Sequence, residues 1–161
     1  SIMRGTPLML QLLVVYFGPF FIAGANISGF RFYAVIIGFS LNYAAYFAEI
    51  YRSGIESMPV GQYEAATVLG YSKSQTFIRI ILPQVIKRIL PAVTNEIITL
   101  VKDTSLAFAI AYQEMFTIAK QITASNGNFT ALFVAGLFYY IFNFIVAFVM
   151  ERFEKKLSYY R

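Results

Sequence analysis

The 161-residue chain is rich in apolar residues (58%) and poor in charged ones (13%). A soluble domain of this length would carry about twice that charged fraction, so the composition indicates a membrane protein. Cysteine and histidine are both absent, which excludes a disulfide framework, a thiolate metal site and the commonest general base. The net charge of +5 is attributed to basic residues that flank membrane spans rather than to a nucleic-acid-binding surface.

Apolar stretches at four places along the chain are predicted to cross the membrane as helices. They cover residues 7–22, 32–50, 90–112 and 129–149. The first stretch is short for a bilayer that needs about 20 residues, and Pro19 is expected to kink or end it. Pro91 is expected in the first turn of the third helix, where a proline is tolerated. No stretch alternates polar and apolar residues, so an all-α polytopic membrane protein is predicted, with a polar outer segment at 113–128.

The most polar long interval is 62–83, between the second and third predicted spans. Its first part is a good helix former, and Gly70 stands where a left-handed helix stop is expected. Ser72 and Gln75 have the spacing of a capping box, which predicts a second helix that opens there and runs to Pro83. The interval therefore reads as a helix, a sharp turn and another helix in a loop between two spans.

The first of these two helices carries a distinctive group of side chains. Glu64 is followed by the small residues Ala65 and Ala66. Small side chains allow another surface to come close, and a carboxylate is a strong acceptor for a cationic partner. The group can therefore serve as a docking surface. On the residues alone, an ordinary capped helix–turn–helix that links two spans is an equally good interpretation.

Basic residues orient the chain in the membrane. If the interval 62–83 lies in the cytoplasm, most of them fall on the cytoplasmic side, namely Arg4, Arg52, Lys73, Arg79, Lys87, Arg88, Arg152, Lys155, Lys156 and Arg161. Only Arg31 and Lys120 then fall outside, and Lys102 falls within a span. This bias is what the positive-inside rule predicts, and the opposite orientation would violate it.

Two polar stripes run along the predicted spans. The second span carries Asn42, Tyr46 and Glu49 on one helix face, and the third carries Asn95, Thr99, Lys102 and Asp103, with Glu96 beside them. An ionisable group in hydrocarbon costs about 2.5–3.5 kcal/mol on the gentler insertion scales. These side chains are therefore expected to face a cavity, one another or a partner rather than lipid.

Each polar side chain has two interpretations. Lining a passage for a polar solute is one, because Glu49 or Glu96 suits an ammonium or guanidinium group and Lys102 suits a carboxylate. Holding helices together is the other, and Glu49 can pair with Arg52 three residues later. At residues 102–103 the helix is expected to open, since the following threonine and serine can satisfy freed backbone groups.

The spacing in the polar interval resembles a known signature. E-A-A at 64–66 is followed after three residues by Gly70 and after nine more by I-x-L-P at 80–83. This pattern resembles the cytoplasmic signature of permease subunits of binding-protein-dependent ABC importers. Further stretches resemble the polar amino-acid branch of that family, namely R-G-T-P-L at 4–8, S-L-N-Y-A-A-Y at 40–46, A-E-I at 48–50 and K-D-T-S-L-A at 102–107. The likeness covers nearly the whole chain.

The resemblance implies a type I ABC importer permease core. Such a core has about five spans, so with four found here we expect an N-terminal helix to be missing from this sequence. Residues 1–161 would form a single transmembrane permease domain with a cytoplasmic coupling loop at about 57–85. In that loop Glu64, Ala65 and Ala66 would dock on an ATP-hydrolysing subunit, and Gly70 would turn the chain.

The family also implies the partners. They are ABC ATP-binding subunits, a second permease subunit that is identical or closely related, an extracytoplasmic solute-binding protein and an amino-acid substrate, all at the bacterial inner membrane. No G-x-x-x-x-G-K-[ST] motif occurs in the chain. ATP and Mg²⁺ are therefore expected on the partner ATPase subunit, and this chain is expected to be a transporter subunit without its own cofactor, metal or enzymatic activity. Transport would proceed by alternating access.

Alternative functions remain open at this stage. A channel or structural membrane subunit could use the same polar stripes without coupling to ATP, and it would not require Glu64. An importer of the same class could instead carry an opine, a sulfur compound, a peptide or an inorganic ion. A membrane-embedded enzyme is disfavoured because no H-E-x-x-H motif or nucleophile–base pair is present.

Overall fold

The chain folds into helices, and the computed structural model describes residues 2–157. The α-helices are α1 (Ile2–Gly5), α2 (Leu8–Ala23), α3 (Arg31–Glu56), α4 (Val60–Val68), α5 (Lys73–Thr76), α6 (Leu82–Asp103), α7 (Met115–Asn126) and α8 (Thr130–Leu157). A π-helical turn, η1 (Phe77–Ile81), precedes α6, and a 3₁₀-helix, η2 (Thr104–Ile110), follows it. No strand occurs in the described part of the chain, so the predicted all-α class is confirmed.

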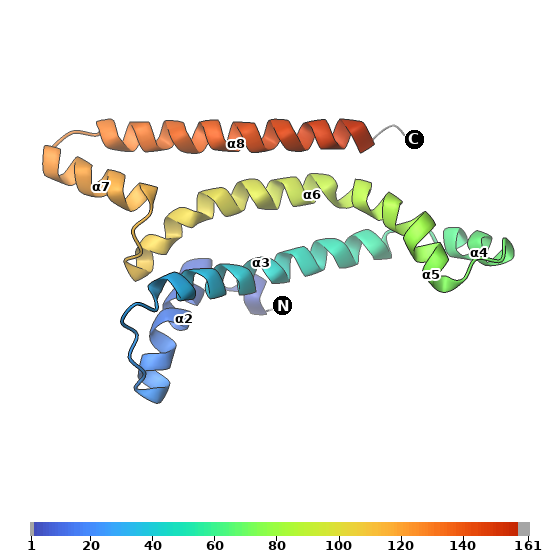
Figure 1. Cartoon of the computed structure of the whole chain (residues 1–161), viewed down its shortest axis with the longest axis horizontal. Coiled ribbons are helices and arrows are strands. Elements are labelled where there is room, and N and C mark those ends of the chain that lie inside the picture. Colours follow the sequence, from blue (N-terminus) through green and yellow to red (C-terminus); the bar gives the residue numbers. More distant parts are fainter. Residues whose placement is uncertain (1, 158–161) are drawn as a thin grey trace.

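Three long helices run side by side along the molecule. Figure 1 shows α6 between α3 and α8, and α6 contacts both neighbours. At one end α2 packs across α3, and at the other end α4 and α5 project beyond the long helices. Helices α3 and α8 are long and apolar enough to cross a membrane, and α2 is apolar but shorter. The predicted spans 7–22, 32–50 and 129–149 therefore coincide with α2, α3 and α8, whereas the predicted span 90–112 is divided between α6 and η2.

The structure corrects the prediction for Pro91 and excludes one of the two outcomes expected at Pro19, the end of the helix. Helix α2 continues through Pro19 to Ala23 and ends at Gly24, whose φ is 61°, so Pro19 does not end it. Pro91 lies inside α6 rather than in a first turn. A proline cannot donate the hydrogen bond that a helix interior needs, and kinks accompany that loss. Figure 1 shows that α6 is bowed along its length.

The second helix of the polar interval does not stop at Pro83. The chain passes from α5 through η1 directly into α6. Pro83 lacks the N–H that would bond the Arg79 carbonyl, and its ring would clash with that group in an α-helix. The wider π-helical turn avoids both problems, because the Leu82 N–H donates to the Phe77 carbonyl five residues back. The side-chain amide of Gln84 donates to the Ile80 carbonyl at 2.8 Å.

The outer segment also gains a structure that the sequence analysis did not assign. Residues 115–126 form α7, which packs along α8. Glu114 caps its N-terminus by accepting hydrogen bonds from the Phe116 N–H at 2.6 Å and the Thr117 N–H at 2.7 Å. A carboxylate at this position also interacts favourably with the helix dipole.

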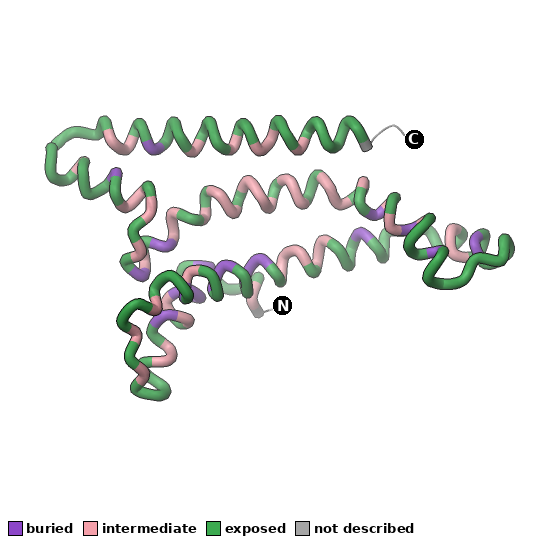
Figure 2. The backbone as a smooth tube through the Cα atoms, viewed as in Figure 1, coloured by how far each residue is buried: buried purple, intermediate pink, exposed green. Residues whose placement is uncertain are grey.

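Most large apolar side chains lie on the outside of the chain. On α8 Phe133 is 78% exposed and Phe138 is 60% exposed, whereas Ala135 is buried. Figure 2 shows that α8 is mostly exposed along its whole length. A helix that is apolar all round normally lies in a membrane or within a larger assembly. The fold therefore presents faces that lipid or partner subunits would cover.

Glycines allow the closest helix approaches. A Cβ atom at Gly54 of α3 would lie 2.3 Å from Cγ2 of Ile89 and 3.2 Å from Cγ1 of Val85, both on α6. A Cβ atom at Gly38 would lie 2.6 Å from Cδ2 of Leu12 on α2. The separations of 2.3 and 2.6 Å are too short for a real Cβ contact, so a side chain at either glycine would force Ile89 or Leu12 to shift.

Gly54→Ala is expected to destabilise the protein by about 1–3 kcal/mol, because the added methyl group overpacks the α3–α6 contact. Gly136→Ala in α8 is the matched control, since nothing lies within 4 Å of a Cβ atom there. Thermal denaturation of the purified protein in detergent measures both effects. Equal melting temperatures for the two variants would contradict the close approach at Gly54.

Candidate functional site

Helix α4 carries the E-A-A segment at the far end of the molecule from α2 (Figure 1). Glu64 and Ala65 are exposed, whereas Ala66 is only 1% exposed. The sequence analysis assigned both alanines to a docking surface. The structure buries Ala66 against its own chain, so only Glu64 and Ala65 of the three present side chains outward.

The turn after α4 has the predicted geometry. Gly70 adopts φ = 80°, a left-handed conformation that favours glycine. The Tyr71 N–H donates to the Ala66 carbonyl and the Gly70 N–H to the Thr67 carbonyl, both at 3.0 Å. These two hydrogen bonds form a Schellman motif, which ends the helix and reverses the chain. The predicted helix stop at Gly70 is confirmed.

The capping box that opens α5 is also present. The Ser72 N–H donates to Oε1 of Gln75 at 2.9 Å, and the Gln75 N–H donates to Oγ of Ser72 at 3.3 Å. These bonds satisfy backbone donors that the first turn of a helix leaves free. The Schellman motif and the capping box together fix the short connection between α4 and α5.

Apolar side chains accompany Glu64 on the outer surface of α4 and its turn. Val60 is 70% exposed, Val68 is 87% exposed and Leu69 is 74% exposed. Exposed apolar groups beside one carboxylate are typical of a surface that another protein covers. We call Val60, Glu64, Ala65, Val68 and Leu69 the α4 surface.

Several contacts join α4 and the preceding loop to the beginning of α6. Met58 packs with Ile81 and Val85 in a small buried cluster, and Tyr63 of α4 packs against it. The guanidinium of Arg88 donates to the Ser57 carbonyl at 2.6 Å. These contacts pack α4 and the loop before it against the beginning of α6.

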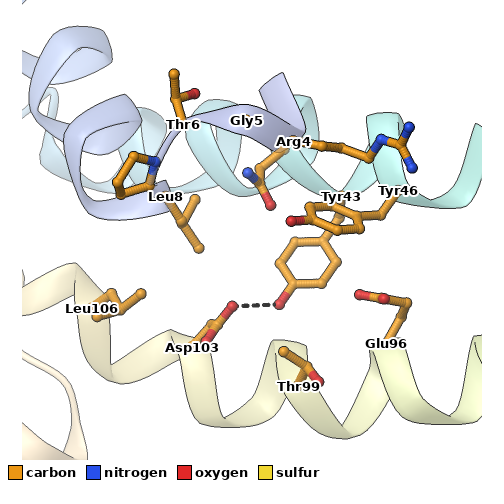
Figure 3. Close-up of a pocket in the computed structure, with 12 residues that line it drawn as sticks. Arg4, Gly5, Thr6, Leu8, Tyr43, Tyr46, Glu96, Thr99, Asp103 and Leu106 are labelled. Atoms are coloured by element: carbon orange, nitrogen blue, oxygen red, sulfur yellow. Dashed lines mark hydrogen bonds between the residues drawn. The ribbon is translucent and has the colours of Figure 1, made fainter. Parts of the chain in front are cut away.

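A polar cavity of about 470 Å³ lies among α3, α6 and the N-terminal residues. Figure 3 shows side chains from these elements turned toward it. Its lining consists of Arg4, Gly5, Thr6, Pro7, Leu8, Asn42, Tyr43, Tyr46, Glu96, Thr99, Asp103 and Leu106. The guanidinium of Arg4 and the carboxylates of Glu96 and Asp103 thus border the same cavity.

The cavity gathers some of the residues that the sequence analysis singled out and omits others. Asn42, Tyr46, Glu96, Thr99 and Asp103 line it, whereas Glu49, Asn95 and Lys102 do not. On α6 the lining residues are spaced by three and then four, so they share one helix face. Asn95 and Lys102 are exposed on the surface of α6. The sequence pattern alone did not decide which of the neighbouring residues faces inward.

Hydrogen bonds hold the cavity walls together. The Tyr43 hydroxyl of α3 donates to Oδ2 of Asp103 at the end of α6, at 2.7 Å (Figure 3). The Asn42 amide donates to Oε1 of Gln11 on α2 at 3.0 Å, and both side chains are buried. Sequence reasoning missed Tyr43 and Gln11. Tyr43 directly follows Asn42 of the polar stripe, and Gln11 is a lone amide in an apolar stretch. These two features are the signals that could have identified them.

The end of α6 confirms the predicted helix opening. The α-helix stops at Asp103 and continues as the 3₁₀-helix η2. The Thr104 hydroxyl donates to the Val101 carbonyl at 2.7 Å, and the Ser105 hydroxyl donates to the Lys102 carbonyl at 2.9 Å. These side chains satisfy carbonyl groups that the end of an α-helix leaves free.

Glu49 is engaged in ion pairs next to the cavity. Its carboxylate lies 2.7 Å from the guanidinium of Arg52, as the spacing allowed, and 3.5 Å from that of Arg4. Arg4 also lines the cavity. Arg4 therefore connects the N-terminal segment to α3 at the cavity wall, a role that sequence reasoning did not assign.

Comparison with known proteins places this geometry in a family. Residues 1–159 match the family described as binding-protein-dependent transport system inner membrane component. The chain belongs to this family, and the resemblance read from its motifs is confirmed. A crystal structure titled as an amino acid ABC transporter with histidines matches with a TM-score of 0.84 and 32% identity, over 96% of this chain and 72% of that one. The fold is thus the type I ABC permease core.

Curated relatives extend over the same region. The arginine transport system permease protein ArtQ of Bacillus subtilis is 40% identical over 98% of this chain and 72% of that protein. A putative glutamine transport system permease protein GlnP of Rickettsia felis is 37% identical over the same shares. The inward-facing MetNI methionine ABC transporter shares the fold, with a TM-score of 0.76 at 20% identity.

Tyr43→Phe is expected to destabilise the protein by about 1.5–3 kcal/mol, because the Asp103 carboxylate loses the hydrogen bond that the Tyr43 hydroxyl donates. Tyr46→Phe is the matched control, since the described residues show no hydrogen bond from the Tyr46 hydroxyl. Thermal denaturation in detergent compares the two variants. If Tyr43→Phe melts no lower than Tyr46→Phe, the Tyr43–Asp103 bond does not join α3 to α6.

Proposed function

We propose that this chain is the permease subunit of an ATP-driven importer of polar amino acids. The observation that carries the proposal is the exposed α4 surface with Glu64 at its centre, followed by the Schellman turn at Gly70. Membership of a family of binding-protein-dependent transport components suggests a role for this surface. It would dock in a groove of an ATP-hydrolysing subunit, where Glu64 meets a basic residue.

The solute class follows from the relatives and agrees with the cavity. Matched permeases are named for arginine, glutamine, L-cystine and octopine, which are amino acids or amino-acid derivatives. In the cavity Glu96 and Asp103 can bind an ammonium or guanidinium group, and Arg4 can bind a carboxylate. These groups would form a polar passage through the membrane for a zwitterionic solute.

The assembly would contain two permease subunits, two ATPase subunits and an extracytoplasmic binding protein. ATP and Mg²⁺ would be held by the ATPase subunits. The distribution of basic residues supports a cytoplasmic position for α4 by the positive-inside rule, and the ATPase subunits would work on that side. Closure of the ATPase pair would move α4, and the contacts of α4 with the beginning of α6 would pass that movement to the cavity.

Glu64→Lys is expected to reduce ATP-driven uptake at least about tenfold, because truncating or reversing a docked charge costs 2–5 kcal/mol or more. Glu154→Lys near the end of α8 is the matched charge reversal away from the α4 surface. Uptake of radiolabelled arginine and glutamine into proteoliposomes that contain the full-length permease and its partner subunits measures the effect. Equal uptake by both variants would remove the docking role of Glu64.

Glu96→Ala is expected to change the uptake rate or the KM at least about fivefold, because the cavity loses one of its carboxylates and a charge-assisted hydrogen bond contributes about 1.5–3 kcal/mol. Asn95→Ala is the matched control, since the neighbouring residue is exposed and lies outside the cavity lining. The same proteoliposome assay, run across substrate concentrations, separates rate from KM. An effect of Asn95→Ala as large as that of Glu96→Ala would contradict the cavity as the passage.

A further inference from the structure

A second cavity opens where the beginning of α6 faces the end of α8. Its volume is about 690 Å³, and α6 contacts α8 in the fold. Apolar side chains of Ile80, Leu82 and Ile86 line it together with the cationic side chains of Arg79, Lys87 and Lys156. We call these six residues and the space between them the basic groove. None of them belongs to the α4 surface or to the polar cavity.

The charged side chains that line the basic groove are all cationic. Arg79 and Lys156 are exposed and Lys87 is half-buried, and the described lining contains no acidic residue. On α8 the carboxylate of Glu151 pairs with Lys155 at 2.5 Å. Three positive charges therefore border an apolar space.

The wall of the groove is structurally defined. Arg79 lies in the π-helical turn that Pro83 imposes, and Gln84 stabilises this turn through the Ile80 carbonyl. Short π-helical segments occur frequently at functional sites. The same Gln84 amide lies 3.4 Å from Oε1 of Gln62 on α4, so the groove wall is connected to the α4 helix.

We propose that the basic groove binds an anionic phospholipid, with the phosphate at the three cations and an acyl chain along the apolar side chains. The proposal rests on the proposed function, because an importer permease with α4 in the cytoplasm has the beginning of α6 and the end of α8 at the cytoplasmic surface of the membrane. Basic pockets between helices at that level bind anionic headgroups. A free phosphate ion would leave the apolar lining unused, whereas a phospholipid matches both halves of the groove.

Bound lipid would also affect coupling. It would bridge the beginning of α6 and the end of α8, next to the Gln84–Gln62 contact that leads to α4. The position of α4 relative to the spans would then depend on occupancy of the basic groove. ATP-driven uptake is accordingly expected to be higher in proteoliposomes of phosphatidylglycerol and phosphatidylcholine than in phosphatidylcholine alone.

Native mass spectrometry of the full-length permease complex, titrated with phosphatidylglycerol, tests the proposal. The variant is Arg79→Gln with Lys156→Gln. The matched control is Lys120→Gln with Arg152→Gln, whose cations lie over the rings of Phe108 and Phe148 outside the groove. We expect the variant to bind phosphatidylglycerol about 25-fold more weakly than the wild type, since each basic residue contributes about fivefold in affinity. The control is expected to bind like the wild type.

Three results would overturn the proposal. They are equal phosphatidylglycerol binding by variant and wild type, equal binding of phosphatidylcholine and phosphatidylglycerol by the wild type, and displacement of the lipid by inorganic phosphate at the same concentration. Loss of the ATPase subunit from the variant with lipid binding unchanged would also overturn it and assign the groove to protein docking. Bound lipid is measured from the mass of the permease itself. A wild type that assembles with no ATPase subunit would therefore refute the proposed function, while the lipid proposal could still be tested. Circular dichroism of the variant verifies that its helix content is retained.

Discussion

The hydrogen bond from the Tyr43 hydroxyl to Asp103 joins the two helices on which the remaining structure depends. A carboxylate at the C-terminal end of a helix is unfavourable by itself, because the helix dipole is negative there. Tyr43 compensates for this by donating to it across the cavity. The bond holds α3 against α6 at one end, and the close approach at Gly54 holds the same two helices further along. The polar cavity lies between the same two helices.

The same pair of helices links the cavity to the α4 surface. Helix α3 leads into α4 through a short loop, and α4 is packed onto the beginning of α6 by the Met58, Ile81 and Val85 cluster. Buried side chains thus connect α4 to α6, and α6 also forms one wall of the cavity. This arrangement suits a machine in which ATP-driven movement outside the membrane changes access to a passage within it. The basic groove stands beside this connection, where lipid could set its resting position.

Much of this account could be predicted from the sequence. Composition indicated a membrane protein, and the capping box at Ser72 and the stop at Gly70 were recognisable because their spacing is local. The predictions that failed concern features that depend on contacts between helices. The chain remains helical past Pro83 because the π-helical turn η1 precedes it, and α6 contains Pro91 in its interior, and no local rule reveals either feature. Ala66 resembled a surface residue until the fold buried it. Glu96 and Asn95 are neighbours in sequence, and only the rotation of α6 decides which one faces the cavity.

The central claim is that the α4 surface docks on an ATP-hydrolysing subunit through Glu64. Affinity purification of the full-length permease from native membranes, with and without Glu64→Lys, tests it most directly when mass spectrometry identifies the co-purifying proteins. The account predicts that an ATPase subunit accompanies the wild type and is lost from the charge-reversal variant, while both permeases stay folded. Absence of an ATPase subunit from the wild type, in a detergent that keeps its helices intact, would contradict the account.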